Sequence, residues 1–170
     1  MNSKQQGMVY VFTGDGKGKT SAAIATAVRA IGAGLSVSWV GFYKQPSWQS
    51  SEVEVLKHIG VKIYLMGKGF FIHESTREIH VQAAQAALKK AADLNCDVLI
   101  LDEICNAIND QLIELDSVLQ FISKRNKTHL ILTGRHAPEK LIQLADLVTS
   151  MEKIKHPYDR GLMAIRGLDF

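Results

Sequence analysis

The sequence has little of what marks secreted, disulfide-bonded or membrane-spanning proteins. It holds 2 cysteines among 170 residues. Cys96 and Cys105 flank an expected strand that would hold them up to ~30 Å apart, which excludes a disulfide between them. No apolar run reaches the roughly 18 residues that a membrane span needs, and residues 1–7 lack the apolar region of a signal peptide. We therefore expect a protein of the reducing cytoplasm that makes no contact with membranes.

Proline and charge of one sign are also scarce. The sequence has 3 prolines, 46% hydrophobic residues and 22% charged residues, a balance typical of a folded globular chain rather than a disordered one. Its formal net charge is +3 and its basic residues are scattered, so we expect no nucleic-acid partner. The length of 170 residues fits a single domain over residues 1–170.

Short apolar runs alternate with helical patterns along the chain. The runs predict strands at residues 8–13, 37–43, 61–65, 97–101 and 128–133, and a last central strand at 147–154. The patterns between them predict helices at residues 19–33, 51–59, 75–94, 111–124 and 138–144. Glu78 follows Ser75 at the spacing of a capping box, which predicts the start of the third helix. The tail from Lys155 shows no pattern that predicts an element.

The run DVLIL at residues 97–101 is almost wholly apolar, as in strands that helices cover on both faces of a parallel sheet. Together with the β-α alternation, it predicts a doubly wound α/β fold with a mostly parallel sheet. Ligands of such folds bind at the carboxyl ends of the strands. The candidate residues at these ends are Thr13, Tyr43, Asp102, Glu103 and the segment Thr133-Gly134-Arg135.

A glycine-rich loop follows the first expected strand. Its end, Gly18-Lys19-Thr20, matches the phosphate-loop pattern G-x-x-x-x-G-K-[ST], although Thr13 stands where the pattern has its first glycine. Glycines let backbone N–H groups surround phosphate oxygens, and the following helix adds the positive end of its dipole. The alternative is a flexible glycine turn, but a loop between a strand and a helix with this ending favours a triphosphate site.

The loop therefore predicts a three-layer fold like that of the phosphate-loop NTPases, of the RecA type. Within it, Lys19 can reach the β and γ oxygens of the nucleotide. The predicted nucleotide-binding residues of the loop are Thr13, Gly14, Asp15, Gly16, Lys17, Gly18, Lys19, Thr20 and Ser21.

Two acidic residues follow the fourth expected strand. In phosphate-loop enzymes a carboxylate at this place holds Mg²⁺ directly or through water, and the loop hydroxyl binds the same ion. A helix cap or a strand-end turn would also explain Asp102 and Glu103, but the glycine-rich loop favours the metal role. We predict Mg²⁺ as a cofactor, with Thr20, Glu103 and Asp102 as its ligands.

Two more segments fall on the expected ligand edge with more than one interpretation. Arg135 could bind a phosphate or a substrate carboxylate, or it could pair with a nearby acid and fix a loop. Phe70 and Phe71 follow Gly69 after the third expected strand. They could meet a large, flat, apolar ligand, or one of them could close the top of the core.

Together these motifs resemble the ATP:corrinoid (cob(I)alamin) adenosyltransferases of the phosphate-loop type. The likeness covers essentially the whole chain, and the motifs are specific as a set. Beside the loop, they are Arg29-Ala30-Ile31-Gly32, Gly69-Phe70, Arg77-Glu78, Leu101-Asp102-Glu103, Thr133-Gly134-Arg135, Lys155-His156 and the ending Gly167-Leu168-Asp169-Phe170.

The resemblance implies transfer of the 5′-deoxyadenosyl group of ATP to the Co(I) of a corrinoid, with release of the whole triphosphate. Co(I) would be the nucleophile, so no protein base is needed. The implied catalytic residues are Lys19, Glu103 and Phe70, and the nucleoside is assigned to Arg29. The implied corrinoid-binding residues are Phe70, Phe71, Ile72 and Arg135. The implied partners are ATP, cobalamin or a cobalamin precursor, an electron-donor protein such as a flavodoxin, and a second copy of the chain in a homodimer.

Two features depart from the family pattern. Ile72 stands where many members have a tryptophan, and we expect Phe71, which the pattern lacks, to compensate. Few residues precede Thr13, so we expect the chain to lack the longer N-terminal segment that helps to cover the nucleotide in some relatives. The rival interpretation is a phosphate-loop small-molecule kinase or ATPase, which would need a positioned base and a mobile lid.

Overall fold

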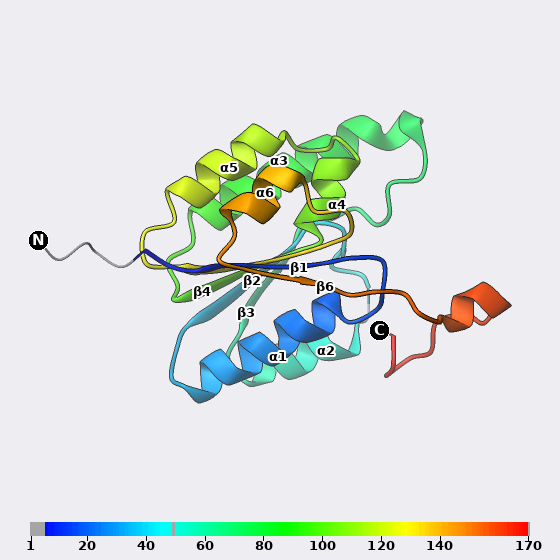
Figure 1. Cartoon of the computed structure of the whole chain (residues 1–170), viewed down its shortest axis with the longest axis horizontal. Coiled ribbons are helices and arrows are strands. Elements are labelled where there is room, and N and C mark those ends of the chain that lie inside the picture. Colours follow the sequence, from blue (N-terminus) through cyan, green and yellow to red (C-terminus); the bar gives the residue numbers. More distant parts are fainter. Residues whose placement is uncertain (1–5, 49, 170) are drawn as a thin grey trace, which may run out of the picture.

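Six parallel strands form one sheet in the order β3-β2-β4-β5-β1-β6 (Figure 1). The computed structural model describes residues 6–48 and 50–169, so most of the polar N-terminal segment and Phe170 of the ending lie outside the described residues. The strands are β1 (Val9–Thr13), β2 (Val37–Gly41), β3 (Lys62–Leu65), β4 (Val98–Asp102), β5 (His129–Thr133) and β6 (Leu147–Ser150).

Helices cover both faces of this sheet (Figure 1). One face carries α1 (Lys19–Gly32) and α2 (Ser51–His58). The other face carries α3 (Arg77–Ala92), α4 (Ile104–Asn109), α5 (Leu115–Ser123) and α6 (Glu139–Leu144). Two short 3₁₀ helices, η1 (Glu74–Thr76) and η2 (Pro157–Arg160), complete the elements. The arrangement confirms the predicted three-layer, doubly wound α/β fold.

The alternation of side chains along the strands divides the core into two clusters. On β4, Leu99 and Leu101 join the cluster under α3 to α6, whereas Ile100 joins the cluster over α1 and α2. Helix α1 meets the sheet with small residues, among them Ala23 and Ala27, which are both fully buried. Because each buried large aliphatic side chain contributes about 1.5–3 kcal/mol, the covered central strands hold their carboxyl ends firmly in place.

Strand β6 corrects one expectation from the sequence. It was expected to be central, but among the described residues it lies at the edge of the sheet, pairs with β1 alone, and ends at Ser150. All four of its residues are exposed. The apolar start of the run suggested a covered strand, whereas the polar residues Thr149 and Ser150 suit an edge that faces water.

The helical layer beyond β4 also differs from expectation. The helix expected at residues 111–124 begins only at Leu115, and a separate six-residue helix, α4, precedes it and was missed. The capping box of Ser75 and Glu78 does not form, because Ser75 lies in η1 and α3 begins at Arg77 without a side-chain cap. Both cysteines are free, as expected. Within the described residues, no helix combines the length and apolarity needed to cross a membrane.

Candidate active site

The glycine-rich loop joins β1 to α1 and is shaped by the segment that follows β6. Gly16 donates its N–H to the carbonyl of Met151 at 2.7 Å. Gly14 has a φ of +93°, and a Cβ atom added there would lie 2.4 Å from the same carbonyl oxygen. Only glycine combines this backbone conformation with so close an approach. The glycines therefore serve the fold of the loop as well as any contact with phosphate.

Thr13, which replaces the usual first glycine, has a structural role. Its side chain is buried, and its hydroxyl accepts a hydrogen bond from the backbone N–H of Ala137 at 3.1 Å. Its backbone carbonyl accepts from the N–H of Met151 at 2.8 Å. Thr13 thus ties the start of the loop to the segments that follow β5 and β6.

Lys19 lies with its ammonium group inside the loop. Its Nζ donates to the carbonyl oxygens of Gly14 at 2.7 Å and of Gly16 at 2.6 Å. Partial burial, and then the charge of Arg135, lower the pKa of Lys19 from its ordinary value. A partly desolvated cation in this loop suits the binding of phosphate oxygens.

Asp102 ends β4 and is fully buried. Its Oδ1 accepts hydrogen bonds from the hydroxyls of Thr133, at 2.8 Å, and of Thr20, at 3.1 Å. Its Oδ2 is buried and accepts no hydrogen bond, an uncommon state for a carboxylate oxygen. The structure thus brings together Thr20 and Asp102, two of the three predicted magnesium ligands.

Glu103 follows Asp102 with a φ of +66° and leads directly into α4. Its N–H donates to the hydroxyl of Thr133 at 2.9 Å, so one threonine contacts both acidic residues. Burial, and then the neighbouring charge of Asp102, raise the pKa of Glu103, although Lys44 and Lys19 oppose the rise. Within the described residues, no three His, Cys, Asp or Glu side chains cluster as a complete metal site.

Lys44 belongs to this site although the sequence did not suggest it. Its Nζ donates to Glu52 at 2.6 Å and lies 3.6 Å from Oδ2 of Asp102. Burial favours a lower pKa for Lys44, but Asp102 and Glu52 outweigh it and raise the pKa. Lys44 comes just after the end of a strand expected at residues 37–43, and this position was the only signal in the sequence.

Arg135 and His136 face the phosphate loop from the segment after β5. Nη1 of Arg135 lies 3.9 Å and Nε2 of His136 lies 3.7 Å from Oδ1 of Asp15. All three side chains are more than half exposed, so these contacts are weak. Helix α4 holds the segment, because Asn109 donates to the backbone carbonyls of Arg135 and His136 at 2.8 and 3.0 Å.

The two phenylalanines after Gly69 have different surroundings. Phe70 is 62% exposed and Ile72 is 73% exposed. Phe71 instead packs on the core, with its ring 5.5 Å from the ring of His80 and the guanidinium of Arg77 at 4.8 Å from its centroid. The core interpretation is confirmed for Phe71, whereas contact of the exposed Phe70 with a ligand stays a prediction.

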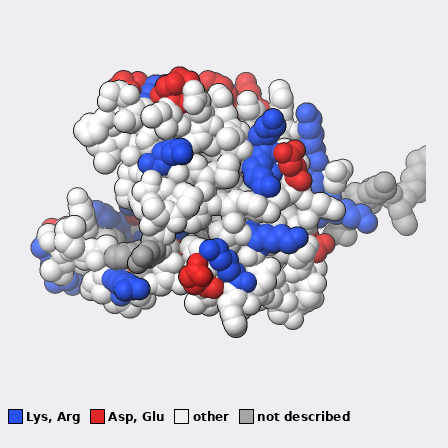
Figure 2. Space-filling view, turned by 180° about the vertical axis from the view of Figure 1, so that it is seen from behind, with Lys and Arg blue, Asp and Glu red and all other residues white. Residues whose placement is uncertain are grey.

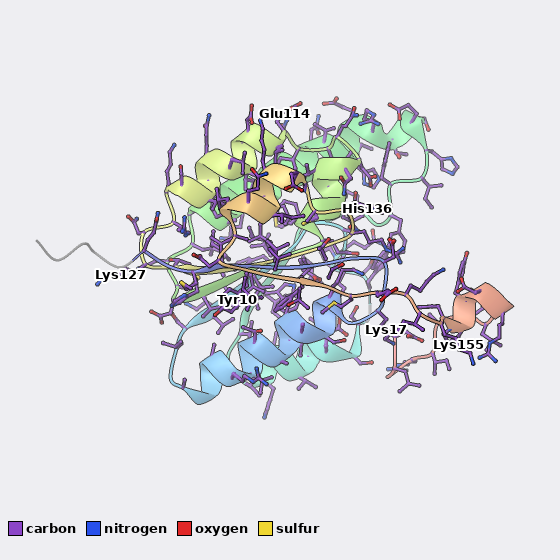
Figure 3. The ribbon with its side chains drawn as sticks, viewed as in Figure 1. Tyr10, Lys17, Glu114, Lys127, His136 and Lys155 are labelled. Atoms are coloured by element: carbon purple, nitrogen blue, oxygen red, sulfur yellow. The ribbon has the colours of Figure 1, made fainter. Side chains whose placement is uncertain are left out.

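Two other predicted residues, Lys17 and Arg29, lie at the margin of the site and away from it. Lys17 and His136 stand at the carboxyl end of the sheet and Lys127 at the opposite end (Figure 3). Lys17 contacts the C-terminal tail, donating to the carbonyl of Leu168 and to the carboxylate of Asp169. Arg29 is exposed in the last turn of α1, ~15 Å along the helix from Lys19, so the structure does not bring it to the loop.

The charged surface of the molecule shows no dominant sign on the side drawn in Figure 2. Lys and Arg residues form small separate groups among neutral residues, and acidic residues line one edge of the same face. The absence of a nucleic-acid partner stays a prediction.

Comparison with known proteins agrees with the geometry. The sequence profile of the family described as "ATP:corrinoid adenosyltransferase BtuR/CobO/CobP" matches residues 5–170. A corrinoid adenosyltransferase of Escherichia coli (strain K12) is 35% identical over 171 residues, which cover 98% of this chain and 87% of the relative. One of Sinorhizobium sp. is 37% identical over 174 residues, which cover 98% and 81%.

Among solved structures, the flagellar accessory protein FlaH of Methanocaldococcus jannaschii has a similar fold. The TM-score is 0.56 at 16% sequence identity, and the match covers 85% of this chain and 71% of the other. A sequence identity this low shows similarity of the fold and nothing about function. The family profile and the relatives together show that the chain belongs to the ATP:corrinoid adenosyltransferases of the BtuR/CobO/CobP family.

Proposed function

We propose that this protein transfers the 5′-deoxyadenosyl group of ATP to the Co(I) of a corrinoid. Co(I) attacks C5′ of the ribose with its electron pair, so a Co–C bond forms and the C5′–O bond breaks. The bonding electrons leave with the triphosphate, and cobalt becomes formally Co(III). The observation that carries the proposal is that the phosphate loop with Lys19 and the exposed Phe70 both lie at the carboxyl ends of strands in the same parallel sheet.

The role proposed for the loop is to hold a whole triphosphate as a leaving group. Lys19, together with loop N–H groups that turn toward the phosphates, would stabilise the negative charge that grows on the departing oxygen. The loop also fixes the position of C5′, since the triphosphate it holds is bonded to that carbon. Neither task needs a protein base, because the nucleophile is supplied by the substrate.

We propose Mg²⁺ as the cofactor, held by Thr20, Asp102 and Glu103 together with the triphosphate. Mg²⁺ commonly takes one or two carboxylates, and substrate phosphates and water supply the rest of its ligands. The buried Oδ2 of Asp102, which accepts no hydrogen bond, supports this role, and so does the contact of Oδ1 with Thr20. When bound, the ion would neutralise part of the charge on the triphosphate.

The proposed corrinoid side is the loop with Phe70 and Ile72. Their exposed side chains offer apolar contact to a macrocycle, and Phe70 would displace the lower axial ligand of cobalt and so make Co(II) easier to reduce. Arg135 is proposed to bind a polar group of the corrinoid beside the phosphate loop. Phe71 would support Phe70 from the core side, since its own ring packs on Arg77 and His80.

Product analysis tests the proposal against the kinase or ATPase alternative. The protein is incubated with MgATP and chemically reduced cobalamin, and the products are separated by chromatography. We expect triphosphate and a corrinoid with the absorption spectrum of a Co–C bond, and we expect EDTA to abolish both. ADP and phosphate with unchanged corrinoid would instead support phosphoryl transfer.

We further propose that residues 1–170 act as one domain in the cytoplasm, as a homodimer. All six strands join one sheet, which supports a single domain. Edge strand β6 and the exposed apolar residues of the tail, such as Ile154 and Met163, support contact with a second copy. The acceptor is proposed to be cobalamin or a cobalamin precursor, reduced by an electron-donor protein such as a flavodoxin.

A further inference from the structure

Trp48 stacks on Phe70, and no motif in the sequence pointed to it. The two ring centroids lie 5.2 Å apart with an angle of 51° between the ring planes. Phe70 is 62% exposed, and Trp48 is partly exposed. The two rings therefore form one aromatic surface that the core does not cover, which we call the Trp48–Phe70 platform.

Backbone hydrogen bonds hold the two halves of the platform together. Gly67 donates to the carbonyl of Lys44 at 3.0 Å, and Gly69 donates to the carbonyl of Tyr43 at 2.9 Å. A Cβ atom on Gly67 would lie 2.1 Å from the carbonyl oxygen of Tyr43, so only glycine permits this approach. The loop after β3 is thereby fastened onto the segment after β2, one strand nearer to Asp102 in the sheet.

A second glycine places the tryptophan. Gly69 has a φ of +92°, and a Cβ atom added there would lie 3.4 Å from Cζ2 of Trp48. The indole ring therefore lies close to Gly69, and the backbone N–H of Trp48 donates to the carbonyl of Gln45 at 3.0 Å. This turn and the contact with Phe70 hold the indole ring beside Gly69.

The same segment connects the platform to the nucleotide side of the site. Lys44 precedes the turn that carries Trp48, and its Nζ lies 3.6 Å from Oδ2 of Asp102. Asp102 in turn contacts the hydroxyl of Thr20 in the phosphate loop. One continuous set of contacts thus joins the triphosphate site to the exposed aromatic rings.

We propose that Trp48 is a corrinoid-binding residue, and that it contacts the macrocycle together with Phe70. Two rings at 51° cannot both lie flat on one planar ligand, so one presents its face and the other its edge. Such a surface fits the puckered, methylated face of a corrin better than it fits a flat nucleobase. The inference rests on the proposed adenosyl transfer and adds a specificity residue to it.

The test compares Trp48→Ala, Trp48→Phe and the wild type by steady-state kinetics with cob(I)alamin and MgATP. Loss of an aromatic contact is expected to raise the KM for the corrinoid about five- to tenfold, while the KM for ATP changes less than twofold. Trp48→Phe is expected to restore most of the affinity. Val55→Ala is the matched control, because Val55 is 62% exposed on α2 and belongs to no part of the site.

In the Phe70→Ala background, Trp48→Ala should still raise the KM for the corrinoid if Trp48 itself contacts the macrocycle, and should have no further effect if Trp48 merely supports Phe70. A spectroscopic measurement then tests whether the platform acts on cobalt. With Co(II) corrinoid and MgATP bound, the visible spectrum reports how cobalt is axially ligated. We expect Trp48→Ala to shift this spectrum toward that of the free corrinoid and Trp48→Phe to retain the wild-type spectrum. Unchanged KM and spectrum in a folded Trp48→Ala protein would overturn the inference, and so would a rise confined to the KM for ATP.

Failure of the proposed function would look different. If the wild type forms ADP and phosphate and no Co–C bond, adenosyl transfer is wrong and the inference falls with it. If the wild type forms the Co–C bond but the Trp48 variants match it, only the inference fails.

Discussion

The phosphate loop and the Trp48–Phe70 platform both lie at the carboxyl ends of the strands, but they differ in how they are built. In the loop, polar groups are satisfied by neighbours: Lys19 by two loop carbonyls, and Thr13 by the backbone of Ala137. In the platform, the backbone is fastened and the apolar side chains are left open. The difference teaches that a charged ligand needs donors fixed in advance, whereas an apolar ligand needs exposed surface.

Removing the charge at the centre of the loop should give the largest effect. Lys19→Ala is expected to lower kcat/KM for ATP by about a thousandfold, since a single fixed donor to developing charge contributes roughly a hundred- to a thousandfold. A steady-state assay of adenosyl transfer measures this loss in kcat/KM. Lys57→Ala, on the exposed side of α2, is the control, and a loss below tenfold for Lys19→Ala would place the triphosphate elsewhere.

Adding a methyl group inside the loop should lower the free energy of unfolding without changing any charge. Gly14→Ala combines a positive φ with a Cβ atom 2.4 Å from the carbonyl oxygen of Met151. Backbone strain of this kind costs about 1–3 kcal/mol of unfolding free energy, and the close contact adds to it. Chemical denaturation followed by circular dichroism measures the change.

Gly60 provides the matched control for that measurement. Its φ is +101°, and a Cβ atom added there would meet nothing within 4 Å. Gly60→Ala should therefore show the cost of the backbone conformation alone, about 1 kcal/mol. Equal losses for the two variants would mean that the loop yields to the added methyl group, and that its close contact with Met151 is not rigid.

The smallest expected change in the free energy of unfolding is that of Phe70→Ala, which is compared with Phe71→Ala. Phe71→Ala should lower the unfolding free energy by about 2 kcal/mol, below the roughly 3–5 kcal/mol of a fully buried phenylalanine. Phe70→Ala should change it by less than about 0.5 kcal/mol, as for other exposed positions, and should weaken corrinoid binding instead. Thermal melts and corrinoid titrations on the same two variants would contradict this division if the effects were exchanged.

The sequence predicted the layers of the fold and the phosphate loop because both depend on short-range patterns. The loop is recognised in the sequence from its own glycines, Lys19 and Thr20, and the run before Asp102 is buried on both faces. Helix α4 was not predicted because its six residues are too few to show a helical period in the sequence. It also begins directly after Glu103, which has a left-handed backbone conformation. The capping box failed because the chain entered α3 through η1.

Lys44 and Trp48 escaped for another reason. Their roles depend on contacts between separate segments: Lys44 reaches Asp102 after β4, and Trp48 stacks on Phe70 after β3. Their residue types carry no sign of it, since lysine and tryptophan are common on any surface. Long-range contacts leave no local pattern, so the acceptor side of the site was only partly visible in advance.

The contact of Lys17 with Asp169 has a practical consequence for experiments on this protein. It brings the end of the described chain beside the phosphate loop, whereas β1 starts at the opposite end of the strands (Figure 1). An affinity tag or fluorophore fused at the C-terminal end would emerge next to the phosphate loop, and one placed ahead of β1 would emerge far from it. The N-terminal side is therefore the better place to immobilise or label the protein.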